Sequence, residues 1–207
     1  MLAYTEKIQE TARKLLKDKT VDVFVGYSKG TVAMMNEPVL IRDPDKADML
    51  YWDSFCGLNL CNYLTKREDR IGIVATGCNS RNIVTHIIEN QIKREQLYIV
   101  GIPCTGMIDH RAVARAVGHR EIGDVKEEGD SFTVTGRDFE ETIKKKDFLQ
   151  LNCRTCRHRN PVIHDEMIAE PVKEQAEVEA YKDVEKIEDM TSEDKWGFFS
   201  RMIEGCI

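Results

Sequence analysis

The chain has 207 residues, of which 42% are hydrophobic, and this length suits one α/β domain with an appendage. Its formal net charge of −6 argues against a nucleic-acid partner. No apolar run approaches the roughly 20 residues that span a bilayer, and the charged residues 1–19 contain no secretory signal core, so we expect a cytoplasmic protein.

The first third of the chain alternates between helical and extended patterns. Apolar residues recur at helical spacing over residues 4–17, and residues 21–25 form a short apolar run typical of a buried strand. The elements expected up to residue 65 are, in order, a helix at 4–17, a strand at 21–25, a glycine-bracketed turn at 26–31, two extended pieces at 32–35 and 39–41, a short helical turn that opens at Asp43-Pro44, and a helix at 50–65.

The centre of the chain organises the prediction. Apolar runs at 71–75 and 97–101 flank a helical pattern at 81–92, which is the signature of a βαβ unit with parallel strands. In such sheets, ligands bind at the carboxyl ends of the strands. Here both strand-end turns, 77–82 and 103–106, carry a cysteine.

The rest of the chain adds a small insertion and a charged appendage. The elements expected there are a helix at 110–117, a β-hairpin at 121–125 and 131–135, a polar helix at 138–148, and a charged loop at 151–165. Residues 170–195 hold ten acids and four lysines and so carry the whole net charge. They predict an extended linker or a solvated helix, with a docking surface for a basic partner as the alternative. The predicted fold is α/β: residues 1–169 form a mostly parallel sheet with flanking helices and a small β-hairpin insertion, and an acidic C-terminal appendage follows, with a linker at 170–195 and a last segment at 196–207.

Seven cysteines without a secretion signal favour a reducing compartment and metal or redox use over a disulfide framework. Cys56 and Cys61 lie in an apolar pattern and are expected to pack in the core. Cys153 and Cys156 form a CxxC pair in the charged loop, away from the helix start that a thioredoxin-like redox pair requires. Two thiolates at this spacing can bind one metal but do not complete its coordination, so other ligands must join them.

Two completions of this site compete. His158 and His164 from the same loop would make a zinc site, although the single residue between Cys156 and His158 is cramped for tetrahedral geometry. Cys78 and Cys104 from neighbouring strand ends would instead complete four thiolates, which suit an iron–sulfur cluster. Four cations would offset the charge of that cluster: Arg81, Arg154, Arg157 and Arg159. Reduced surface thiols in a basic loop remain the third alternative.

The strand-end turns also carry groups that suit a phosphate. Ser80 and Asn82 stand where the central helix should begin; they are ordinary helix caps, but the same position exposes backbone N–H groups to an anion. Residues 28–31, Ser-Lys-Gly-Thr, repeat this chemistry at the end of the first strand. Neither a P-loop nor a GxGxxG motif occurs, so a nucleotide cofactor would be bound in another way.

The order of these motifs resembles the coenzyme F(420) hydrogenase/dehydrogenase beta-subunit family. The resemblance covers residues 20–168 and rests on four short motifs: Val21-Asp-Val-Phe-Val-Gly-Tyr27, Gly77-Cys-Asn-Ser-Arg81, Glu89-Asn-Gln-Ile-Lys-Arg94 and Val100-Gly-Ile-Pro-Cys-Thr-Gly106. More narrowly, it looks like the members found beside heterodisulfide reductase-like and formate dehydrogenase modules, which carry a CxxC followed by Asn-Pro. Asn79 replaces the aspartate of the family's Cys-Asp-Ser-Arg turn.

The resemblance implies a flavin-binding α/β domain that passes electrons between a two-electron carrier and iron–sulfur clusters. Many members of the family carry a ferredoxin-like segment with two clusters. Residues 196–206 resemble the beginning of such a segment, with Cys206 as its first cysteine, although the sequence stops one residue later, at Ile207. We therefore expect either a truncated chain or a separate ferredoxin-like partner.

The predicted function is that of an electron-transfer subunit of an oxidoreductase complex, with FAD and a 4Fe–4S cluster as cofactors and other redox subunits as partners. The residues expected at the flavin are Ser28, Lys29, Gly30, Thr31, Ser80, Arg81, Asn82, Thr105 and Gly106. Those expected at the cluster are Cys78, Cys104, Cys153 and Cys156. The alternative is a non-enzymatic assembly module with a structural zinc site at the CxxC.

Overall fold

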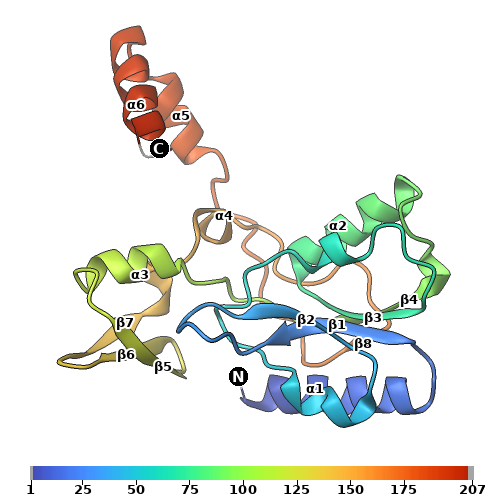
Figure 1. The fold of residues 1–207 in the computed structure, drawn as a ribbon. Coiled ribbons are helices and arrows are strands. Elements are labelled where there is room, and N and C mark those ends of the chain that lie inside the picture. The colour runs from blue at the N-terminus through green and yellow to red at the C-terminus, as the bar shows by residue number, and fades with distance from the viewer. Residues whose placement is uncertain (1, 205–207) are drawn as a thin grey trace.

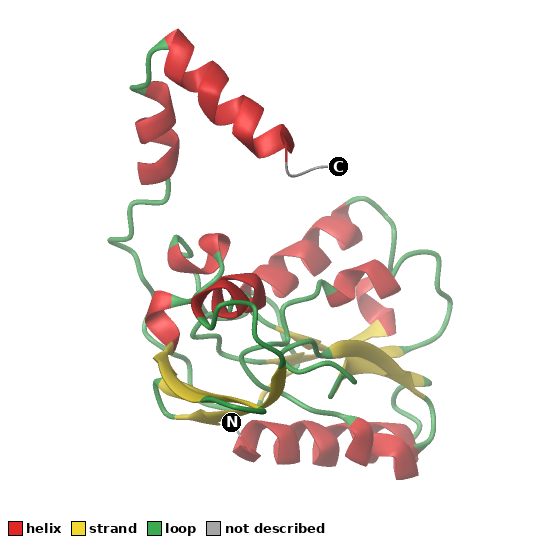
Figure 2. Ribbon diagram, turned by 60° about the vertical axis from the view of Figure 1, so that its left-hand side comes forward, coloured by secondary structure: helices red, strands yellow, loops and turns green. Residues whose placement is uncertain are grey.

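The computed structural model describes residues 2–204, and its centre is a five-stranded sheet (Figure 1). The strand order is β2 (Glu37–Ile41), β1 (Val23–Ser28), β3 (Ile71–Ala75), β4 (Leu97–Gly101) and β8 (Glu166–Met167). β1, β3, β4 and β8 run parallel, whereas β2 is antiparallel to β1. One face of the sheet is covered by α1 (Leu2–Lys17) and the other by α2 (Gly77–Ile88) (Figure 2). The predicted α/β class with a mostly parallel sheet is therefore confirmed.

The central strands are buried because helices lie against both faces of the sheet. Every residue of β3 is buried, and β1 and β4 are each buried except at one position. The predicted apolar stripe of α1 packs in the same core: Ile8, Ala12, Leu15 and Leu16. The predicted unit of strand, helix and strand at the centre of the chain corresponds to β3, α2 and β4.

Residues 50–65 do not form the predicted helix. Many of their apolar side chains are buried, but the backbone runs through turns and a short 3-10 helix, η2 (Leu60–Tyr63). Side chains replace the helical hydrogen bonds here: Asp53 Oδ1 accepts from the Phe55 backbone N at 2.7 Å, and the Asn59 side chain caps η2 in the same way. The apolar spacing of this segment therefore reflects burial and not helical periodicity.

The predicted polar helix at 138–148 is also wrong, because its centre is a strand. It completes a second, antiparallel sheet with the order β5 (Ile122–Glu128), β6 (Ser131–Gly136) and β7 (Glu140–Lys144). Ile143 stands opposite Phe132 in this sheet, and both are buried in one apolar cluster with Val113 of α3 (His110–Ala116). The predicted hairpin is confirmed, and the cluster under it explains why the next segment is extended.

Three other boundaries differ from the prediction. Residues 32–35 form a turn, with Met34 at a φ of 63°, and not an extended piece. α2 begins at Gly77 and not at residue 81, since Thr76 precedes it in an extended conformation and accepts the first helical bond, from Ser80 N at 2.8 Å. The charged loop contains a short helix, α4 (Leu151–Arg154), and then returns to the main sheet as β8.

The acidic run divides into two parts. Residues 172–178 lie along the charged loop, to which they are hydrogen-bonded. Beyond them, α5 (Lys182–Glu188) and α6 (Ser192–Glu204) project from the body of the molecule, and neither contains a buried residue (Figures 1 and 2). Cys206 lies outside the described residues. Within residues 2–204, no helix combines the length and the apolar character that crossing a bilayer needs.

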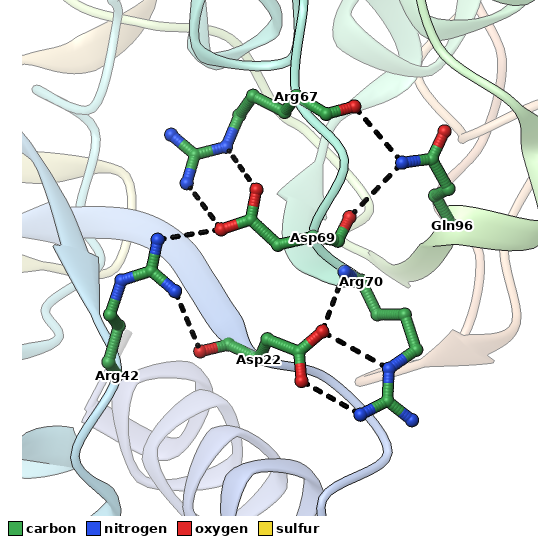
Figure 3. A network of polar contacts seen from close by, with 6 residues as sticks. All are labelled: Asp22, Arg42, Arg67, Asp69, Arg70 and Gln96. Carbon is green, nitrogen blue, oxygen red and sulfur yellow. Dashed lines mark hydrogen bonds and ion pairs between the residues drawn. The ribbon is translucent and has the colours of Figure 1, made fainter.

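A polar network holds the amino ends of the central strands (Figure 3). Asp22, just before β1, accepts hydrogen bonds from the backbone N and the guanidinium of Arg70, just before β3. Asp69 accepts from Arg42 at 2.6 Å and from Arg67 at 2.8 Å, and these pairs lower the pKa of Asp69 to about 2. Ion pairs therefore hold the amino ends of the central strands together, and the cysteines lie beyond the carboxyl ends of these strands.

Candidate functional site

Four cysteines from three separate segments line one cavity at the carboxyl ends of the central strands. Cys78 lies in the first turn of α2 after β3, Cys104 follows β4, Cys153 lies in α4, and Cys156 comes just after α4. The cavity that they line has a volume of about 70 Å³, and we call it the cysteine cavity. The structure therefore brings the four predicted cysteines to one shared cavity, and a metal site there stays a prediction.

Close backbone contacts bring the three segments together. The backbone of Gly77 lies so near the charged loop that a Cβ atom there would stand 2.6 Å from the carbonyl oxygen of His158. The Cys104 backbone N donates to the Arg159 carbonyl at 3.0 Å. On the other side, the Val162 N donates to the Ser80 Oγ at 3.0 Å. A side chain at position 77 would therefore push the CxxC loop away from α2.

The sulfur atoms receive hydrogen bonds from the surrounding backbone. Gly106 N donates to Cys104 Sγ at 3.3 Å, and Met107 N donates to Cys153 Sγ at 3.3 Å. Burial, with smaller contributions from the neighbouring Cys153 and Cys78, raises the pKa of Cys104 to about 12. Burial is also the main cause of the raised pKa of Cys153. Binding of a metal to these sulfurs would therefore release protons, because thiolates are the metal-binding form.

Cys56 also lines the cysteine cavity, and Cys61 lies in the core close to it. Both are buried, as predicted. Cys61 donates its S–H to the Asn79 carbonyl at 3.3 Å, and Cys56 Sγ accepts from Asn36 Nδ2 at 3.3 Å. Cys61 does not line the cavity, so it provides a matched buried thiol for comparison with Cys78, Cys104, Cys153 and Cys156, which we call the four cavity cysteines.

A zinc ion and an iron–sulfur cluster need different sets of ligands. Among residues 2–204, no three His, Cys, Asp or Glu side chains are arranged to hold one metal ion. His158 lines the cysteine cavity, whereas His164 packs beside Gly101 and does not. A 4Fe–4S cluster would be held by four cysteine thiolates. A cavity of about 70 Å³ has room for several atoms, since one water needs only about 10–15 Å³. Cys78, Cys104, Cys153 and Cys156 all line this cavity, so the donor types present suit a cluster of this kind.

A second and larger cavity, of about 820 Å³, adjoins the first and is called the large cavity here. The two share Cys104, Gly106, Met107 and Arg159 in their walls. This volume is within the range of about 300–1,000 Å³ that is typical of small-molecule and cofactor sites. The large cavity therefore has the size of a cofactor site and lies directly beside the cysteines.

Three consecutive lysines, residues 144–146, lie along the large cavity at the end of β7. Lys145 forms an ion pair with Glu127, which also accepts hydrogen bonds from the backbone N and the hydroxyl of Ser54. Asp53 lines the same wall, and burial raises its pKa to about 6. Lys144 and Lys146 are exposed and have no ion pair among the described side chains, so they remain available to an anionic ligand.

The residues predicted for the flavin are only partly brought together. Thr105 and Gly106 line the large cavity. Seven others line neither cavity: Ser28, Lys29, Gly30, Thr31, Ser80, Arg81 and Asn82. Some of these groups are used within the fold. The Ser80 hydroxyl donates to the Gly77 carbonyl at 2.9 Å, Arg81 Nη1 donates to the same oxygen at 2.7 Å, and Gly30 is packed against the Met35 carbonyl.

Sequence reasoning missed the lysines at 144–146, because it assigned them to a helix, and it missed Gln175, because it treated the acidic run as a linker. It named Arg159 as one of four neighbouring cations. Of those four, Arg159 alone is buried, at 5% exposure, and it lines both cavities. Arg154 and Arg157 are exposed. The Asn-Pro sequence after Arg159 was the one signal that this part of the loop has a fixed conformation.

Comparison with known proteins gives a likeness in fold. No family model matches the sequence, and no curated protein matches it. A chain from a xenon-derivatised structure of the F420-reducing nickel–iron hydrogenase complex of Methanosarcina barkeri has a similar fold, with a TM-score of 0.55 and 16% sequence identity. The match covers 73% of this chain and 61% of that one, so this chain spans less than two thirds of the length of that neighbour. The fold of this protein is thus similar to that of a chain in a hydrogenase complex.

Proposed function

We propose that this chain is an electron-transfer subunit of an oxidoreductase complex, which holds a 4Fe–4S cluster on Cys78, Cys104, Cys153 and Cys156 and a flavin beside it. One observation carries the proposal: four cysteines from three distant segments line a cavity that shares a wall with a second cavity of cofactor size. Four thiolates are the usual ligand set of such a cluster. The fold likeness to a chain of a hydrogenase complex supports a place among other redox subunits.

The flavin is proposed for the large cavity. A bound flavin takes up two electrons as hydride and releases them one at a time, which suits a neighbouring one-electron centre. Thr105 and Gly106 line the large cavity, and Gly106, at a φ of 111°, also lines the cysteine cavity and allows a close approach of the backbone. Lys144 and Lys146 supply positive charge for the phosphates of FAD.

The sequence analysis predicted that the phosphates of FAD lie at Lys29 and Ser80. Variants at Lys29 and Lys146 distinguish that location from the large cavity. If FAD occupies the large cavity, Lys146→Glu should weaken its binding by about 1 kcal/mol, because an exposed cation beside a phosphate is replaced by an anion, while Lys29→Glu has little effect. The opposite ranking, with Lys29→Glu and Ser80→Asp the weaker binders, would place the phosphates at the end of β1. Isothermal titration of FAD into cluster-loaded protein under anaerobic conditions measures both.

The proposal as a whole is tested by loading the chain with iron, sulfide and FAD without oxygen and titrating it with dithionite. We expect bleaching of the flavin absorption together with the appearance of the electron paramagnetic resonance signal of a reduced cluster, both in one chain. A folded and cluster-loaded sample that binds no FAD would leave a bare electron-relay subunit. A colourless sample with one zinc per chain would favour the alternative, an assembly module with a structural zinc site.

A further inference from the structure

We infer that Arg159 is the internal cation of the cysteine site, and that its guanidinium makes the cluster held by the four cavity cysteines easier to reduce. This inference rests on the proposed function.

The Arg159 side chain is buried and incompletely paired. The residue is 5% exposed, and its Nη1 is buried without a hydrogen-bond partner among the described residues. The partners of the guanidinium are neutral: Gln175 Oε1 accepts from Nε at 3.2 Å and from Nη2 at 2.6 Å, and the Cys153 carbonyl accepts from Nη2 at 3.2 Å. Glu174 accepts a hydrogen bond from the backbone N of Arg159, and no ion pair among the described residues involves the Arg159 side chain.

A buried charge without a partner of opposite sign is strongly unfavourable. An anion close to the unpaired Nη1 of Arg159 would therefore stabilise the buried guanidinium. The guanidinium lines the cysteine cavity beside Cys104 and Cys153, and Nη1 would stand 3.1 Å from a Cβ atom at Gly106, on the wall between the two cavities. A cluster on four thiolates is an anion, and it gains negative charge when it is reduced. A nearby fixed cation stabilises the reduced form more than the oxidised form.

The acidic segment fixes the direction of this guanidinium. Gln175, which accepts two of its N–H bonds, lies in a segment that is hydrogen-bonded to the charged loop on both sides of Arg159. Asn160 and Val172 exchange two hydrogen bonds, at 2.7 and 2.9 Å. The Gln175 backbone N donates to the Arg157 carbonyl at 3.1 Å. Residues 172–178 thus act as a strap that positions the cation, and this gives the first part of the acidic run a role beyond that of a linker.

The test compares the midpoint potential of the cluster in four proteins: wild type, Arg159→Met, Arg159→Lys and Gln175→Ala. Arg154→Met is the matched control, because Arg154 is an exposed arginine of the same loop. In Arg159→Met we expect the equilibrium constant for reduction of the cluster to fall by about tenfold, which lowers the midpoint potential by about 59 mV for one electron. The midpoint potentials of Arg159→Lys and Gln175→Ala should lie between those of Arg159→Met and the wild type. The midpoint potential of Arg154→Met should equal that of the wild type. Iron content, measured on the same samples, reports loading independently of the potential.

The outcomes separate this inference from the proposed function. A cluster that loads normally in Arg159→Met with the wild-type potential overturns the inference and leaves the proposed function intact. Wild-type protein that loads no cluster removes the proposed function and the inference with it. If Arg159→Met does not fold or load, Arg159→Lys and Gln175→Ala decide: potentials equal to wild type in both would contradict the role assigned to the positioned cation.

Discussion

Replacement of Asp69 by asparagine should destabilise the protein by about 2 kcal/mol at neutral pH. Asp69 lies among Arg42 and Arg67 at the amino edge of the sheet, and its side chain is only 20% exposed. The arginines hold its pKa at about 2, against an ordinary value of 3.8. A shift of one pKa unit corresponds to about 1.4 kcal/mol, so the lowering of the Asp69 pKa from 3.8 to about 2 corresponds to roughly 2 kcal/mol of stability.

The pH dependence of this effect follows from the sign of the pKa change. Because the folded protein lowers the pKa of Asp69, the ionised carboxylate stabilises the fold fully above pH 3.8, and this stabilisation is lost as the pH falls towards 2. Urea unfolding of wild type and Asp69→Asn should therefore differ by about 2 kcal/mol at pH 7, and the difference should shrink below about pH 4.

Asp48→Asn is the matched control for this experiment. Asp48 also pairs with an arginine, Arg13, at 2.6 Å, but its side chain is 76% exposed. Exposed pairs of this kind contribute little, so the control should stay within about 0.5 kcal/mol of wild type. Equal free energies of unfolding for the two variants, or a difference between wild type and Asp69→Asn that does not change with pH, would refute the role given to the network in Figure 3.

Three further predictions concern the loop, the second sheet and the appendage. Gly77→Ala should lower the iron content of reconstituted protein, because its Cβ would stand 2.6 Å from the His158 carbonyl; an unchanged iron content would contradict the close contact of α2 with the loop. Glu127→Ala should destabilise the fold by about 3 kcal/mol in urea, since it leaves the largely buried Lys145 without its partner; a loss below 1 kcal/mol would show that this pair is unimportant. Limited proteolysis should cut first within residues 179–191, which lie beyond the segment bound to the charged loop. A main fragment that ends before residue 172 would contradict the binding of residues 172–178 to that loop.

The sequence predicted the centre of the fold well for a physical reason. Strands buried on both faces by helices must be continuously apolar, and Ile71–Ala75 and Leu97–Gly101 are. The hairpin was also predictable, because Gly129 at a φ of 54° marks its turn. From the positions of these strand ends, the sequence also predicted that Cys78 and Cys104 would meet the CxxC loop.

Other elements depend on contacts that a sequence pattern does not contain. Residues 50–65 have apolar spacing close to that of a helix, but hydrogen bonds from side chains such as Asp53 hold them in turns. β8 is a two-residue strand that exists only because β4 offers it an edge. The burial of Arg159 depends on Gln175, sixteen positions later in a segment whose composition predicts a solvated linker. The lysines along the large cavity were hidden by the same misassignment that made β7 a helix.

The most direct measurement of the central claim is the iron and sulfide content of anaerobically reconstituted protein in a series of single variants. The proposal predicts about four iron atoms per chain in the wild type, a severe loss in Cys78→Ser, Cys104→Ser, Cys153→Ser and Cys156→Ser alike, and wild-type content in Cys61→Ala, His158→Ala and His164→Ala. A metal that is retained without Cys78 and Cys104 but lost without the two histidines would contradict the four-cysteine cluster and establish a zinc site within the loop.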